Sequence, residues 1–271
     1  MDEDGNTLVG SGSDEQPSSK RVVRTTLAAS FDGRRNSLNF LRLVLALTVV
    51  CSHALTLGGT GRHASITAED VLNTTPGTVA VYGFFGISGF LIARSATRNH
   101  LGRFLWQRFL RIFPGYWVCL IVTAFVIGVI AWYHPGQAYR PRCGLSCYLD
   151  SSTGPFQYLY HNALLRVNQA SIAHTPRKVA LVHNWNVSLW TLEYEFACYL
   201  IVGIFAVVGL LRRRALLLVL TGALWLCAAY VTFTKYDVTS LDATKLLGLL
   251  PLFLTGSLVY LYWDKIPDSG Y

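Results

Sequence analysis

The sequence predicts an all-α fold, a polytopic transmembrane helix bundle of about six spans that follows a cytoplasmic N-terminal tail. Apolar residues make up 52% of the 271 residues and charged residues only 14%, whereas soluble domains usually carry about 25% charged residues. Six apolar runs reach the roughly 20 residues that a helix needs to cross a bilayer. Basic residues gather in alternate connections between the runs, as membrane topology requires.

Residues 1–37 differ in composition from the rest of the chain. They are rich in Asp, Ser, Gly, Arg and Lys and poor in aromatic residues, which is typical of disordered segments. Their acidic start and long polar stretch are not those of a signal peptide. We therefore predict a disordered cytoplasmic tail at 1–37 and a transmembrane domain at 38–271.

The expected spans follow the apolar runs in order. Backbone groups in lipid must be satisfied within their own segment, so each run is expected to be helical, and a barrel would show short alternating strands instead. Residues 101–112 are a separate feature, in which apolar side chains alternate with arginine, and they predict a helix that lies in the cytoplasmic interface and runs into the membrane at Pro114. The runs are 38–57, 77–96, 113–133, 187–210, 215–234 and 243–262.

The distribution of basic residues predicts a cytoplasmic N-terminus. Five basic residues precede the first run, five arginines surround the connection after the second, and three follow the fourth at 212–214. The loop after the first run holds only Arg62, and the long loop 134–186 counts little because of its length. This topology accounts for the net charge of +8. With no zinc-finger, basic-zipper or RNP signature, we expect no nucleic-acid partner.

Two ionisable residues lie within the first run, Arg42 and His53. Eleven residues are close to three helical turns, so both side chains lie near one face, about 16 Å apart along the axis. Ionisable groups within a span usually face a cavity or a partner. A snorkelling interfacial arginine and a hydrogen-bonded interhelical histidine are the structural alternatives.

Two further patterns carry candidate residues. Arg108 and Arg111 share a helix face and suit phosphate oxygens, although arginines beside spans also serve topology or contact anionic lipid. Glu193 and Glu195 enter the fourth span and point to different sides; a carboxylate near His53 would orient the imidazole. The small residues in 83–95 indicate close helix packing.

Other chemistries find little support. No histidines or cysteines have metal-ligand spacing, so we expect no metal. The sequence contains no P-loop, GxSxG or HExxH motif, which excludes the common soluble hydrolases and nucleotidases. Four cysteines lie in apolar runs and are expected to be small buried residues. Cys143 and Cys147 share a polar loop that permits a disulfide in an oxidising compartment.

Four motifs in this order resemble the acyltransferase 3 family of membrane acyltransferases. They are NSLNFLRLVLALTVVCSHA, GFFGISGFLI, RFLRIFPGYW and SLWTLEYEFACYL. The last motif and the Arg-rich tail are most similar to actinobacterial members. Family members usually have about ten spans, so the chain resembles their first six and is expected to be C-terminally short. It departs from the family at Glu193, where relatives often have proline or a small residue.

The resemblance implies transfer of an acyl group, often acetyl, from cytoplasmic acyl-CoA to a hydroxyl of an envelope carbohydrate, glycolipid or related acceptor. The family's patterns fall on Arg42 and His53, on Arg108 and Arg111, and on Glu195. The expected partners are acyl-CoA (acetyl-CoA foremost) as donor, a carbohydrate or lipid-linked acceptor, and membrane lipid. The oligomeric state is left open.

A mechanism consistent with both lines of reasoning places the donor phosphates on Arg108 and Arg111. His53 is the general base on the acceptor hydroxyl, with an acyl-histidine intermediate as the alternative. Glu195 orients or charge-balances His53, and Arg42 contacts the cofactor or the thioester carbonyl. Two hypotheses from other classes stay open at this point, a membrane transporter and a non-catalytic truncated family member.

Overall fold

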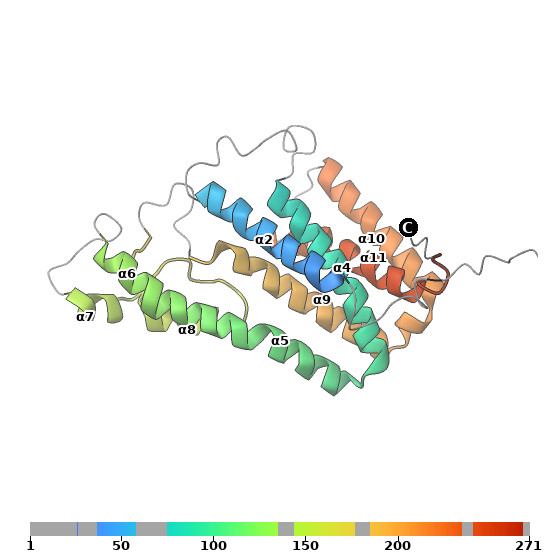
Figure 1. Cartoon of the computed structure of the whole chain (residues 1–271), viewed down its shortest axis with the longest axis horizontal. Coiled ribbons are helices and arrows are strands. Elements are labelled where there is room, and N and C mark those ends of the chain that lie inside the picture. The colour runs from blue at the N-terminus through green and yellow to red at the C-terminus, as the bar shows by residue number, and fades with distance from the viewer. Residues whose placement is uncertain are drawn as a thin grey trace, which may run out of the picture.

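The computed structural model describes residue 26 and residues 37–57, 75–134, 144–176, 185–234 and 241–267. Every regular element within these residues is a helix, which confirms the all-α fold class. The long helices lie side by side as a bundle (Figure 1). Apart from residues 26 and 37, the predicted disordered tail at 1–37 lies outside the described part of the chain.

The helices follow the order of the predicted runs. The long ones are α2 (Leu38–Leu57), α4 (Pro76–Arg98), α5 (Leu101–Val122), α9 (Trp190–Val207), α10 (Arg214–Thr234) and α11 (Leu241–Leu261). The short ones are the π-helical η1 (Thr123–Ile127), α6 (Gly128–Tyr133), α7 (Gly144–Leu149), α8 (Pro155–Asn162) and the 3₁₀ turns η2 (Val187–Leu189) and η3 (Leu210–Arg212).

Five helices of the described chain are long and apolar enough to cross a membrane, and the protein is a multi-pass membrane protein. The first of the six expected spans also forms a helix, α2, but its apolar stretch is shorter and covers Phe40–Leu55. The five full-length spans are Pro76–Arg98, Leu101–Tyr133, Trp190–Val207, Arg214–Thr234 and Asp242–Leu261.

The helix boundary expected at Pro114 does not occur. One apolar helix runs from Leu101 to Tyr133 through α5, η1 and α6, and Pro114 lies inside it. The structure thus joins 101–112 and the predicted span 113–133 into one helix, because proline is tolerated in membrane helices where neighbouring groups satisfy the freed backbone. At about 1.5 Å per residue this helix is about 50 Å long, so it extends beyond the roughly 30 Å hydrocarbon core.

The irregular part of this helix lies further along, at η1. A π-helical turn is a local departure from α-helical hydrogen bonding and is common at functional sites. Here the Tyr148 hydroxyl of α7 donates to the Ala124 carbonyl at 2.5 Å. The Asn186 side-chain amide, just before η2, donates to Thr123 Oγ1 at 2.8 Å. These bonds tie the segments that precede α9 to the π-helical turn.

Small residues of the second span pack helix α4 closely against α11. A Cβ added to Gly89 would lie 1.9 Å from the Phe253 carbonyl oxygen, and one added to Gly256 would lie 1.9 Å from the Gly86 carbonyl oxygen. The Ser257 hydroxyl donates to the Gly89 carbonyl at 3.1 Å. The packing role predicted for the small residues in 83–95 is therefore confirmed for Gly86 and Gly89.

Helix α2 packs against the other side of α4 and runs antiparallel to it. A Cβ on Gly77 at the start of α4 would meet Ser52 near the end of α2, and a Cβ on Gly83 would meet Leu45 near the middle. The beginning of α2 therefore lies toward the end of the bundle where α4 stops. Helix α4 is the central element, because its core residues pack among α2, α9 and α11.

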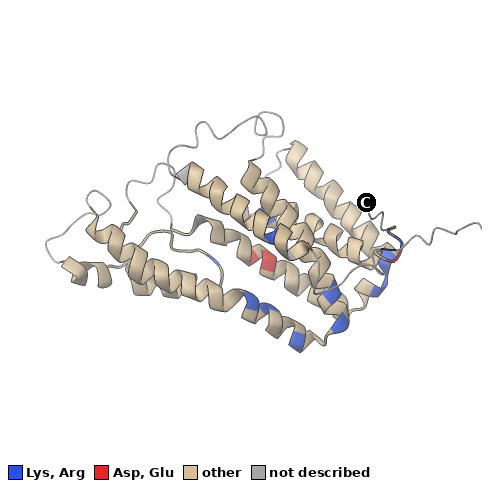
Figure 2. Ribbon diagram, in the orientation of Figure 1, with Lys and Arg blue, Asp and Glu red and all other residues tan. Residues whose placement is uncertain are grey.

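Among the described residues, the two ends of the bundle differ in charge (Figure 2). The α4–α5 turn and the α9–α10 turn meet at one end, since Asn99 and Arg212 line a common cavity. We call this the basic end; it carries Arg94, Arg98, Arg103, Arg212, Arg213 and Arg214. Helices α7 and α8 lie toward the opposite end (Figure 1), and Cys147 of α7 is disulfide-bonded.

Candidate functional site

A buried carboxylate, Glu195 on α9, is the centre of the candidate site. Its side chain is only 6% exposed. The Tyr199 hydroxyl, one turn later on α9, donates a short hydrogen bond to its Oε1, and the Ser88 hydroxyl of α4 lies 3.4 Å from the same oxygen. Buried carboxylates are costly unless they are hydrogen-bonded and charge-balanced. These two hydroxyls supply the hydrogen bonds.

Three arginines supply the charge balance. Arg42 of α2 interacts electrostatically with Arg108, Arg111 and Glu195, and all three guanidinium groups interact with the buried Tyr199. The Arg108 guanidinium lies 6.0 Å from the centre of the Tyr199 ring, and the Arg42 guanidinium lies 4.7 Å from that of Phe84. One carboxylate among three cations leaves the cluster positively charged.

A cavity of about 300 Å³ joins the residues of this cluster. Arg42, Arg111 and Glu195 all line it, so the structure brings together predicted site residues from α2, α5 and α9. Its size falls at the lower end of small-molecule sites. The remaining lining residues are Phe84, Ile112, Gly115, Tyr116, Cys119, Leu189 and Leu192.

Arg108 lies beside the cavity and carries an unsatisfied donor. Its Nε is buried and has no hydrogen-bond partner in the described part of the chain. Leaving a buried charged donor unpaired is unfavourable, and a guanidinium group matches the oxygens of phosphate. The residues around Arg108 therefore fit an anionic ligand, as the Arg-x-x-Arg pattern predicts.

His53 is apart from this cluster. Its Nδ1 lies 2.8 Å from the Val49 carbonyl oxygen. A carbonyl only accepts hydrogen bonds, so Nδ1 carries the proton and Nε2 is the atom with a free lone pair. The hydrogen bonds to Glu195 in the described residues come from Ser88 and Tyr199 rather than from His53. The tautomer of His53 is thus set by its own helix.

The entry of α9 is positioned by Asn186, which adopts a left-handed backbone conformation (φ 57°) that asparagine tolerates better than most residues. Its amide donates to Thr123 at 2.8 Å and to the Tyr158 hydroxyl at 3.1 Å. Burial raises the pKa of Tyr158 to about 12, so this hydroxyl stays protonated. Asn186 thereby fixes the start of the segment that carries Glu195.

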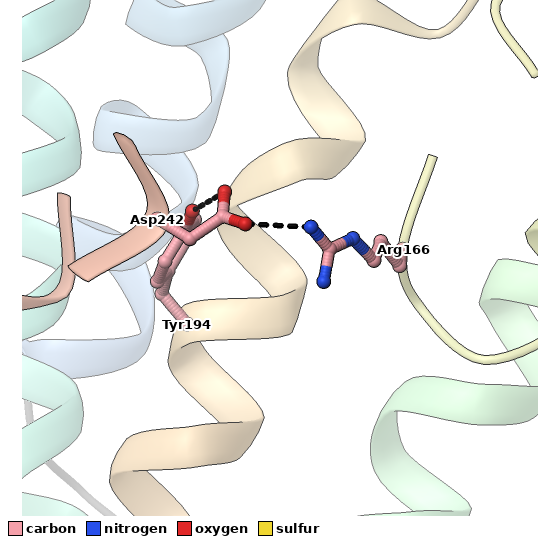
Figure 3. A network of polar contacts seen from close by, with 3 residues as sticks. All are labelled: Arg166, Tyr194 and Asp242. Atoms are coloured by element: carbon pink, nitrogen blue, oxygen red, sulfur yellow. Dashed lines mark hydrogen bonds and ion pairs between the residues drawn. The ribbon is translucent and has the colours of Figure 1, made fainter. Parts of the chain in front are cut away.

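A second contact holds the same end of α9 against α11 (Figure 3). The Tyr194 hydroxyl donates to Asp242 at 3.0 Å, and Arg166 from the segment after α8 donates to the other carboxylate oxygen at 2.6 Å. Asp242 lies in the first turn of α11, where the helix dipole favours a negative charge. Tyr194 is the neighbour of Glu195, so this contact also bears on the site.

Sequence reasoning missed Ser88, Tyr199 and Asn186. The sequence predicts only packing for Ser88, while Tyr199 lies in the fourth motif and Asn186 two residues before it, both without an obvious role. One signal for Tyr199 was available, because it lies four residues after Glu195 and helical neighbours at that spacing meet. Within the part of the chain that the structure describes, no three His, Cys, Asp or Glu residues are placed to hold a metal ion.

Comparisons with known proteins agree with the motif pattern. The family model described as "Acyltransferase domain" (acyltransferase 3) matches residues 35–270. The chain is 32% identical over 194 residues to the "O-acetyl transferase" of Shigella phage Sf6, covering 69% of this chain and 50% of that protein. It is 30% identical over 249 residues to "Nodulation protein 10" of Rhizobium leguminosarum bv. viciae, covering 86% of this chain and 62% of that protein.

The chain thus spans half of one curated relative and about three-fifths of the other. No solved structure matches it. The family model covers most of the sequence and includes all four motifs and every residue of the charged cluster. The chain therefore belongs to the acyltransferase 3 family.

Proposed function

We propose that this protein is a membrane O-acyltransferase that moves an acyl group, often acetyl, from acyl-CoA to a hydroxyl of an envelope carbohydrate, glycolipid or related acceptor. The observation that carries the proposal is the cavity shared by Arg42, Arg111 and Glu195 inside a bundle of the acyltransferase 3 family. Acetyl-CoA is the first donor to test, since one relative is named as an O-acetyl transferase.

The cationic cluster supports an anionic donor. Arg108 and Arg111 take the pyrophosphate of acyl-CoA, which satisfies the buried Arg108 Nε with charge-assisted hydrogen bonds. Glu195 acts as the resident counter-ion that keeps the three guanidinium groups in place before the donor arrives. Arg42 and His53 are about 16 Å apart along α2, so we assign Arg42 to the donor's arm and His53 to its acyl end.

The transfer step follows from these positions. The acceptor hydroxyl oxygen attacks the thioester carbonyl carbon, the carbon–sulfur bond breaks, and CoA leaves as a thiolate. His53 Nε2 takes the hydroxyl proton and returns it to the thiolate, so the products are an ester and the free thiol of CoA. General-base assistance of this kind contributes ~10²–10⁴-fold.

The proposed orientation places the basic end in the cytoplasm of a cell membrane, with the N-terminal tail on the same side. Arginine-rich connections favour that side, and α2 begins toward the end of the bundle where α4 stops. The disulfide-bonded Cys147 belongs in an oxidising compartment, and α7 lies away from the basic end (Figure 1). The donor then enters from the cytoplasm and the acceptor from the opposite side.

Titration with acetyl-CoA tests the donor site. The Arg108→Ala/Arg111→Ala double variant should bind acetyl-CoA ~100-fold more weakly than wild type, because two charged hydrogen-bond donors to phosphate are lost. Calorimetry on purified protein in lipid nanodiscs measures this. The Arg98→Ala/Arg103→Ala variant removes the same charge from the basic end outside the cavity and should change affinity by only about threefold or less. Folded wild-type protein that binds no acetyl-CoA would refute this donor.

A second prediction concerns the counter-ion. Glu195→Gln keeps the size of the side chain but leaves three arginines unbalanced, so acetyl-CoA should bind about fivefold more tightly. Turnover should fall about tenfold or more, because the guanidinium groups that position the donor lose the counter-ion that holds them in place. Binding is measured by calorimetry and turnover by release of free CoA thiol in acceptor-containing membranes. Glu193→Gln is the matched control, since Glu193 does not line the cavity, and should leave both unchanged. Weaker donor binding by Glu195→Gln would contradict the counter-ion role.

A further inference from the structure

A second cavity, of about 310 Å³, opens at the basic end. It lies between the α4–α5 turn and the α9–α10 turn. Its polar groups come from Thr97, Asn99 and Arg212, and its apolar wall from Leu101, Phe104 and Gly203. The wall is tightly packed, because a Cβ on Gly203 would lie 3.2 Å from Leu101 and 3.3 Å from Phe104. A polar rim over an apolar wall is typical of small-molecule sites.

The charge of this cavity points to an anionic ligand. Arg212 lines it, and its side chain has no ion pair or hydrogen bond within the described residues. Its neighbour Arg214, by contrast, is held by both carboxylate oxygens of Asp264 at 2.8 and 2.9 Å. Asp264 is the one carboxylate among the described residues of this end, and Figure 2 shows the blue arginines gathered there.

The same two helices line both cavities. Helix α5 contributes Phe104 to the second cavity and Arg111 to the first, and α9 contributes Gly203 and Glu195 in the same order. Seven residues separate Phe104 from Arg111, which is a rise of about 10 Å. Arg108 lies between them. The two cavities and Arg108 therefore form a line along α5, from the basic end toward the buried carboxylate.

We infer that this second cavity is a phosphate-monoester site that takes the adenosine 3′-phosphate end of the acyl-CoA donor. The inference rests on the proposed function, since it places the remaining phosphate of the donor whose pyrophosphate lies at Arg108. Arg212 is the binding group for the 3′-phosphate and Asn99 lies beside it, while the wall formed by Leu101, Phe104 and Gly203 holds the adenine. A phospholipid headgroup offers the same phosphate chemistry and is the rival occupant.

The test compares acetyl-CoA with acetyl-dephospho-CoA, which lacks only the 3′-phosphate. In nanodiscs of zwitterionic lipid, Arg212→Gln should weaken acetyl-CoA binding about tenfold, the cost of one charge-assisted hydrogen bond, and change dephospho-analogue binding less than about twofold. Arg213→Gln is the matched control: it removes the same charge from the next position, does not line the cavity, and should leave both affinities unchanged. Ala206 also lines the cavity, so Ala206→Leu, which fills it, should weaken the binding of both ligands.

Each remaining outcome decides a different question. If wild type binds neither ligand, the proposed donor is wrong. If it binds both ligands equally well and Arg212→Gln has no effect, the donor site stands and the inference about the second cavity is overturned. In a third outcome the two ligands bind alike, and anionic phospholipid added to the nanodiscs weakens acetyl-CoA binding in wild type but not in Arg212→Gln. The occupant is then a lipid headgroup, and the nucleotide assignment is overturned.

Discussion

Replacing His53 by alanine should lower the rate of acyl transfer by ~10²–10⁴-fold and leave acetyl-CoA affinity unchanged. His53 lies about 16 Å from Arg42 along α2 and does not line the cavity of the charged cluster, so donor affinity does not depend on it. Its Nε2 is the free basic atom, because Nδ1 donates to Val49. The measurement is the release of free CoA thiol in acceptor-containing membranes, beside calorimetric titration of the donor.

The His53→Gln variant separates chemistry from packing. The glutamine amide can donate to the Val49 carbonyl as the imidazole does, but it cannot take a proton at neutral pH. If His53 is the general base, glutamine and alanine variants are equally inactive. Recovery of wild-type turnover in the glutamine variant would mean that the histidine serves only to hold its helix. Acyl transfer to the protein in the absence of acceptor would instead favour an acyl-histidine intermediate.

The second large effect is on stability. Gly256→Ala should destabilise the folded bundle by about 3 kcal/mol, because the new methyl group would lie 1.9 Å from the Gly86 carbonyl oxygen and backbone cannot rearrange as a side chain can. Helices α4 and α11 must then separate, which also breaks the hydrogen bond from Ser257 to Gly89. Thermal unfolding in nanodiscs measures the loss as a lower Tm.

Gly248 provides the matched control on the same helix. A Cβ there meets nothing within 4 Å, so Gly248→Ala should be neutral or stabilise the helix by up to about 1 kcal/mol. The two alanine variants differ only in what the added methyl group meets. Equal melting temperatures for the two would show that the close approach of α4 and α11 does not limit stability.

The helical fold could be predicted because its cause is local. A run of about 20 apolar residues has no stable alternative to a helix in lipid. The spans predicted at 215–234 and 243–262 correspond to the helices Arg214–Thr234 and Leu241–Leu261. Pro114 misled the prediction, because its effect depends on the neighbouring groups. Whether proline ends a helix cannot be read from its own position.

The charged cluster was only partly predictable. Arg42 and Glu195 follow from the rule that ionisable residues within spans face cavities, and Arg111 from its pairing with Arg108 for phosphate. All three line one cavity. The partners of Glu195 could not be predicted, because the same sequence is compatible with a carboxylate near His53 and with a carboxylate beside Tyr199 and Ser88. Which helix face meets which neighbour is set by packing, here by the close approach of α4 through Gly89.

The π-helical turn at η1 has a consequence for the phase of the helix that contains it. Its buried residues recur every fourth position at Tyr116, Leu120, Ala124, Gly128 and Trp132. In a regular α-helix each such step advances about 40° around the axis, so the four steps would rotate this stripe by about 160°. The π-helical turn at η1 accommodates one extra residue, which reverses about 100° of that rotation. One continuous face can therefore line the cavity at Tyr116 and still meet Tyr148 of α7 near its far end.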